Sequence, residues 1–207
     1  MRQCPTPLGP GRNDPFHARV PVPFLAQVFA VMARTPQHTY QVLTKRPGRM
    51  PALLGRAGDG ECPLARHAAP GPDAEALAGQ WPLPNVHLGT SIELDRYARR
   101  ADDLRQAGAA VRFLSLEPLF GPLPSLRLDG IAWCIIGGES GPGARPLDLG
   151  WIRELIARCR DAGTAVFVKQ LGTVWARQHG HRGTKGNDWD TWPADLQVRE
   201  RPRRVTP

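Results

Sequence analysis

Residues 131–145 read I-A-W-C-I-I-G-G-E-S-G-P-G-A-R, and this stretch indicates the fold class. Its first six residues are all apolar, which is typical of a strand in a sheet that is covered on both faces. Two glycines and then Glu139 and Ser140 follow directly. Parallel α/β sheets bind ligands at the carboxyl ends of their strands. We therefore expect a buried parallel strand that ends at a polar site.

The flanking sequence repeats this arrangement of strands and helices. Four more segments have strand character: His38–Leu43, Asn85–Thr90, Val111–Leu116 and Ala165–Val168. Helical spacing of apolar residues predicts helices over Pro21–Arg34, over Leu94–Leu104 and from Asp148 to Gly163, with a short one near Arg49–Leu54. Strands that alternate with helices predict a parallel sheet, either open or closed into a (β/α) barrel. The order begins with a helix that no strand precedes.

Three parts of the chain differ in composition. Residues 1–13 contain three prolines and no periodicity, so we expect them to be unstructured. Residues 14–175 hold the α/β pattern, interrupted at 55–84 by a Pro/Gly-rich stretch that we interpret as a surface insertion. Residues 176–207 are predicted to form an irregular basic tail.

Composition excludes several classes of protein. The 207 residues carry 41% hydrophobic and 22% charged residues, so the chain is not wholly disordered, and four cysteines are too few for a disulfide-stapled mini-protein. No apolar run approaches the roughly 20 residues of a membrane-spanning helix, and the first residues do not resemble a signal peptide. We expect a cytoplasmic protein that does not bind membranes.

The net charge of +8 would ordinarily favour nucleic acid as a partner. However, only three of the 27 basic residues are Lys, and the many Arg, Gly, Pro and Ala residues indicate G+C-rich coding. The arginines are scattered apart from a basic end at 199–204. Nucleic-acid binding is therefore a weakly supported prediction.

Polar residues follow every predicted strand, and we expect them to converge on a small-molecule site with cationic and anionic halves. The catalytic candidates are Glu93, Glu117, Glu139 and Lys169. The candidates for ligand binding are Lys45, Arg46, Ser91, Gly137, Gly138, Ser140, Arg145 and Gln170. Nearby carboxylates repel one another, so at least one needs a raised pKa or a cationic partner such as Lys169 or Lys45. Alternatively, the glutamates cap helices or pair with arginines on the surface.

The glycine-rich stretch after residue 136 has two interpretations. Glycines let backbone N–H groups approach an anion, and Arg145 could hold a phosphate or a carboxylate. A tight structural turn would need the same residues. For Lys169, the alternatives are anion binding, action as a base or nucleophile, or simple exposure at a strand end.

The cysteines and histidines do not predict a metal site. Cys4, Cys62, Cys134 and Cys159 are far apart in the sequence, so we expect reduced thiols. The histidines show no ligand spacing.

Several longer strings resemble a family. They are 28–47 (V-F-A-V-M-A-R-T-P-Q-H-T-Y-Q-V-L-T-K-R-P), 81–93 (W-P-L-P-N-V-H-L-G-T-S-I-E), 111–122 (V-R-F-L-S-L-E-P-L-F-G-P), 135–146 (I-I-G-G-E-S-G-P-G-A-R-P) and 167–172 (F-V-K-Q-L-G). They resemble a phage and bacterial family of unknown function that is related to radical S-adenosylmethionine (SAM) enzymes, and the similarity runs from about residue 14 to residue 192. The resemblance implies a partial (β/α) barrel of radical-SAM type whose N-terminal strands are missing. For full-length members it implies SAM and a [4Fe–4S] cluster, and it suggests a partner protein named for a three-cysteine motif.

The chain departs from that family at its start. Members carry a cysteine cluster upstream of the stretch that matches Asp14–His17, whereas here Cys4 stands alone. A cluster needs three cysteine thiolates from the protein, so we expect this chain to bind none and to hold no cofactor. SAM could still contact Glu117 and residues 137–140, by analogy.

Three alternative functions follow. In the first, the chain is the C-terminal part of a radical-SAM-like protein and is inactive alone. In the second, it is a standalone module that binds a nucleotide, an anion or nucleic acid, and in the third it is a decayed fragment without activity.

Overall fold

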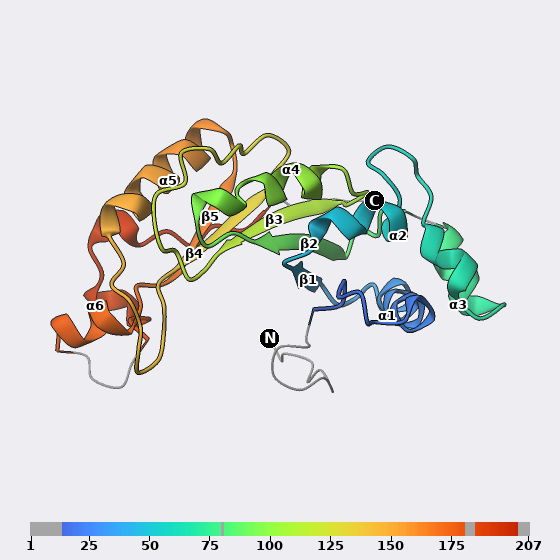
Figure 1. Ribbon diagram of the computed structural model, residues 1–207, viewed down its shortest axis with the longest axis horizontal. Helices are drawn as coiled ribbons and strands as arrows, with labels where there is room; N and C mark the ends of the chain where they lie inside the picture. The colour runs from blue at the N-terminus through green and yellow to red at the C-terminus, as the bar shows by residue number, and fades with distance from the viewer. Residues whose placement is uncertain (1–13, 80, 181–184, 203–207) are drawn as a thin grey trace.

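A computed structural model describes residues 14–79, 81–180 and 185–202, and its centre is a five-stranded parallel sheet (Figure 1). The strands are β1 (Tyr40–Thr44), β2 (Val86–Ser91), β3 (Val111–Leu116), β4 (Trp133–Gly137) and β5 (Ala165–Gln170). All four neighbouring pairs are parallel. The predicted strands and their parallel arrangement are thus confirmed.

The strands lie side by side in chain order, β1-β2-β3-β4-β5. Helix α4 (Arg99–Arg105) connects β2 to β3, and α5 (Leu149–Asp161) connects β4 to β5. Both helices lie above the sheet in Figure 1, as expected when successive right-handed crossovers run in one direction. A doubly wound sheet reverses its strand order, and this sheet does not. The carboxyl ends of all five strands therefore meet at one edge, which we call the rim.

The helix-covered face of the sheet holds an aliphatic core. Leu88, Leu114 and Val166 of three strands are at most 1% exposed. Helix α5 packs on this layer through the predicted apolar face, Ile152, Leu155, Ile156 and Cys159, which is entirely buried. Its N-cap is also as predicted, because Asp148 Oδ1 accepts a hydrogen bond from the Gly150 N–H at 2.7 Å.

The opposite face of the sheet carries a row of aromatic rings. The centroid of Phe113 lies 6.0 Å from that of Trp133, which lies 6.1 Å from Phe167. The guanidinium of Arg201 stacks 5.0 Å from the Phe167 centroid. Residues 198–200 run antiparallel along β5, where the Val168 N–H donates to the Val198 carbonyl at 2.9 Å. This pairing covers the β5 edge of the sheet.

The segment 55–84 differs from the surface insertion that its composition suggested. It contains a 3-10 turn at Pro63–His67 and α3 (Pro72–Gly79), and it buries Leu64 and Leu77 completely. These elements pack against α1 (Val22–Arg34), whose buried face needs a cover. The Phe29 and Trp81 rings lie 6.2 Å apart at that contact. The few apolar residues of this segment therefore form its contacts with the hydrophobic core.

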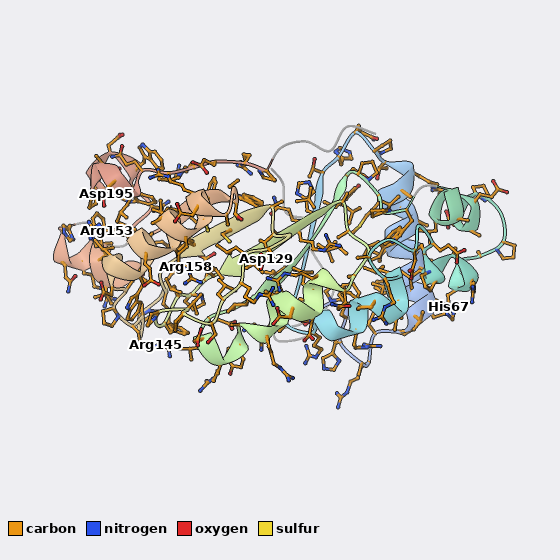
Figure 2. All side chains as sticks on the ribbon, turned by 90° about the horizontal axis from the view of Figure 1, so that it is seen from above. His67, Asp129, Arg145, Arg153, Arg158 and Asp195 are labelled. Carbon is orange, nitrogen blue, oxygen red and sulfur yellow. The ribbon has the colours of Figure 1, made fainter. Side chains whose placement is uncertain are left out.

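Other expectations have mixed outcomes. The short helix α2 (Met50–Leu54) is present, and the helix predicted from Leu94 starts with a 3-10 turn at Asp95–Tyr97 before α4. After α6 (Thr173–Gln178) the described residues include 3-10 turns at Trp189–Thr191 and Ala194–Leu196. Arg153 of α5 pairs with Asp195 of the latter turn at 2.6 Å (Figure 2). The expectations for residues 1–13, Cys4 included, lie outside the described residues. No helix in the described ranges is long and apolar enough to span a membrane.

Candidate rim site

The first cluster at the rim is built around Glu93, which follows β2. Its carboxylate side chain is 9% exposed and pairs with Lys45, at the end of β1, and with Arg100 of α4, whose Nη1 lies 3.3 Å away. The same Nη1 of Arg100 donates to the Ser91 carbonyl at 2.8 Å. Two cations from different elements thus meet on one nearly buried carboxylate.

The second cluster is built around Glu117, which follows β3. Lys169 Nζ lies 2.9 Å from Oε2 of Glu117, and Gln170 Nε2 donates to Oε1 at 2.9 Å. Gln170 Nε2 also lies 3.0 Å from the Gly138 carbonyl and from Ser140 Oγ. The ends of β3, β4 and β5 are therefore joined by one polar network, and Gln170 is 5% exposed at its centre.

The third cluster pairs Glu139 with Arg145 within one loop. Arg145 donates from Nε and Nη2 to the two carboxylate oxygens at 2.9 Å each, and its backbone N–H donates at 2.8 Å. These hydrogen bonds lower the pKa of Glu139 from 4.5 to about 2. The Arg145 guanidinium also lies 3.5 Å from the centroid of Phe120. In Figure 2 Arg145 lies toward the opposite end of the molecule from His67.

Gly137 and Gly138 allow close packing inside the rim. A Cβ on Gly137 would lie 3.1 Å from the Glu117 carboxyl group. A Cβ on Gly138 would lie 2.6 Å from the Leu171 carbonyl oxygen. The N–H of Gly138 donates to the Gln170 carbonyl at 3.0 Å. Both glycines make room for protein atoms, which corresponds to the structural-turn interpretation of this stretch.

A cavity of about 420 Å³ lies beside the Glu93 cluster, between the loop after β1 and α4. We call it the cationic pocket, and its lining is Lys45, Arg46, Pro47, Gly48, Arg96, Tyr97, Arg99, Arg100 and Asp103. Five of the nine residues are cationic and one is anionic. Its volume is within the range of about 300–1,000 Å³ of ligand pockets.

Arg46, one of the binding residues predicted from the sequence, lines this pocket and forms an ion pair with Asp14. Its Nη1 lies 2.8 Å from Asp14 Oδ2, and Asp14 also accepts from Thr44 Oγ1 and the Lys45 N–H. Burial of the Asp14 carboxylate would raise its pKa, but these hydrogen bonds more than offset that effect, and the pKa is lowered. Asp14 thereby fixes the backbone at the end of β1.

A family model for proteins of unknown function, DUF5131, matches residues 11–195. The chain belongs to this family. The DUF5131 match includes all five strands and every rim residue described above. The comparison with curated proteins found no match, and neither did the comparison with solved structures.

The structure brings together only some of the predicted site residues of this DUF5131 protein. Lys45, Ser91 and Glu93 share the first cluster, and Glu117, Lys169 and Gln170 share the second with Gly138 and Ser140. Each of the three glutamates has its own cationic partner: Glu93 pairs with Lys45 and Arg100, Glu117 with Lys169, and Glu139 with Arg145.

Sequence reasoning missed Arg96, Arg99, Arg100 and Asp103 of the cationic pocket. The three arginines follow the spacing i, i+3, i+4, which places side chains on one face of a helix. Because arginine is abundant throughout the chain, this spacing does not by itself mark a site. Only the tertiary fold brings this face against the loop after β1.

The cysteines of the described residues do not fit an iron–sulfur cluster. Cys62, Cys134 and Cys159 are all buried, and Cys134 and Cys159 face each other between β4 and α5. The hydrogen bond with Cys159 and burial raise the pKa of the Cys134 thiol well above its usual value, which disfavours the thiolate that binds iron. Among the described side chains, no group of three or more His, Cys, Asp or Glu could hold a metal ion.

Proposed function

We propose that this DUF5131 protein binds an anionic small molecule in the cationic pocket at the rim. The observation that carries the proposal is the excess of positive charge around a cavity of about 420 Å³, in which Arg96 and Arg99 form no ion pair with a described carboxylate. Guanidinium groups that line a concave site attract anions and hold them by charge-assisted hydrogen bonds.

Counting the internal partners leaves the pocket positive. Lys45 and Arg100 share Glu93, Arg46 pairs with Asp14, and Asp103 adds one further negative charge to the lining. Five positive and three negative charges leave a balance of +2. A ligand with two or more negative charges would neutralise it.

In this proposal the Glu117 and Glu139 clusters have a structural role: they hold the loops at the rim in place. Glu117 is held by Lys169 and Gln170, and Glu139 is held by Arg145, so these carboxylates engage protein groups from neighbouring elements. We assign them the role of joining the strand ends, and we propose binding rather than chemistry as the activity.

Isothermal titration calorimetry of the full chain with nucleoside triphosphates tests the proposal. Saturable binding of an anion that is lost in the double variant Arg96→Ala/Arg99→Ala is the expected result. Arg160→Ala is a matched control, because Arg160 is an exposed arginine near the end of α5, at the amino edge of the sheet. Absence of heat with every anion at millimolar concentration would reject the proposed site.

A second proposal is that the five strands form part of a (β/α) barrel of radical-SAM type. It is supported by the unreversed strand order and by the resemblance of the sequence motifs. Because the described cysteines do not fit a cluster, we propose no step through one. Anaerobic reconstitution followed by iron analysis tests this point: we expect no stoichiometric iron, and about four irons per chain would overturn it.

A further inference from the structure

We infer that the cationic pocket recognises an oligophosphate chain by its charge and does not select the group that the chain carries. This inference rests on the proposed function and names the ligand class of the same site. It follows from two features of the lining: several cations that can bind phosphate groups, and the absence of a free aromatic ring on which a base could stack.

The lining draws its cations from two segments of the chain. Lys45 and Arg46 lie in the loop after β1, whereas Arg96, Arg99 and Arg100 come from the start of α4 and the turn before it. Arg46 and Lys45 are 44% and 60% exposed at the side chain despite their ion pairs, so their N–H groups remain accessible. Guanidinium groups match phosphate oxygens in pairs, and five cations from two segments around one cavity suit several linked phosphates.

The lining has no free aromatic face on which a base could stack. Tyr97 is its only aromatic residue, and the Arg100 and Arg96 guanidinium groups already lie 4.2 and 4.9 Å from the centroid of its ring. The other uncharged lining residues are Pro47 and Gly48. Recognition of a nucleobase relies on stacking and on hydrogen bonds to its edges, and this lining supplies no stacking surface.

Competition calorimetry with a series of phosphates tests the inference. We expect affinity to rise on the order of tenfold for each phosphate added from orthophosphate to pyrophosphate to tripolyphosphate, because each adds charge-assisted hydrogen bonds. ATP, GTP and CTP are expected to bind with affinities within about twofold of one another, because the base makes no stacking contact. The variant Arg96→Ala/Arg99→Ala should abolish binding of every member of the series, whereas Arg160→Ala should leave the dependence of affinity on chain length unchanged.

The outcomes separate this inference from the proposed function. If no anion binds at all, the proposed site itself is wrong. If citrate or orthophosphate binds as tightly as tripolyphosphate, or if the three nucleotides differ by tenfold or more, the anion site stands and the oligophosphate assignment is overturned. A single-stranded oligonucleotide that outcompetes tripolyphosphate would assign the pocket to a nucleic-acid backbone and would also overturn it.

Discussion

Lys169 Nζ lies 2.9 Å from Oε2 of Glu117, although 52 residues separate the two along the chain. The contact joins the carboxyl ends of β3 and β5 across β4, which ends between them in Gly137. Glu117 is 16% exposed at the side chain and Lys169 is 52% exposed. The carboxylate is therefore the enclosed member of the pair, and the ammonium group faces solvent.

This asymmetry predicts unequal effects of substitution. Lys169→Ala should lower the free energy of unfolding by about 0.5 kcal/mol, because an exposed ion pair contributes little. Glu117→Ala should cost about 1–2 kcal/mol, because it removes the acceptor that Gln170 and Lys169 share and leaves a gap beside Gly137. Urea denaturation followed by circular dichroism measures both values, and equal effects would contradict the role assigned to Glu117.

The Glu139–Arg145 pair predicts a pH dependence of stability. The pKa of Glu139 is lowered to about 2 by the Arg145 hydrogen bonds, below the ordinary value of 4.5 that applies to the unfolded chain. The stabilisation is thus complete above pH 4.5 and is lost as the pH falls toward 2. Arg145→Met should weaken the decrease in stability over that window and return the carboxyl pKa, measured by carbon-13 NMR, toward 4.5. An unchanged titration of Glu139 in this variant would contradict the pairing.

The close contact between Gly89 of β2 and the Phe113 ring predicts that a larger side chain at position 89 is destabilising. A Cβ at this position would lie 2.4 Å from the Phe113 ring, which is 2% exposed and cannot move into solvent freely. Gly89→Ala should therefore lower the free energy of unfolding by about 1–3 kcal/mol through overpacking. Gly143→Ala is the control, because a Cβ there meets no atom within 4 Å. The measurement is the midpoint temperature of thermal denaturation. An equal change of this temperature in the two variants would show that the Phe113 ring does not pack on β2.

Asp103 predicts a gain of affinity in the cationic pocket. It is the only carboxylate among the lining residues, so it repels a bound anion. Asp103→Asn should tighten pyrophosphate binding by about two- to fivefold by calorimetry, because one like charge is removed while the side-chain size is kept. Asp161→Asn, at the end of α5 near the amino edge of the sheet, should have no effect. Weaker binding in Asp103→Asn would assign Asp103 a contact to the ligand.

Local patterns in the sequence determined the strands and α5. Consecutive apolar residues such as Cys134–Ile136 mark a strand that is buried on both faces, and Asp148 marks a helix start, because both signals depend only on neighbouring residues. Segment 55–84 gave no such signal. Its helix α3 buries one side chain completely, Leu77, and is stabilised by packing on α1 rather than by its own periodicity.

The sequence alone therefore determined which residues end the strands, and a parallel sheet brings such ends to one edge. It did not determine which of these residues meet. Only the tertiary structure decided which two cations pair with Glu93 and that Lys169 lies against Glu117. It also decided that Arg96, Arg99 and Arg100 face the loop after β1. The physical reason is that ion pairs and pocket walls depend on distances between elements far apart in sequence, and strand register and crossover geometry set those distances.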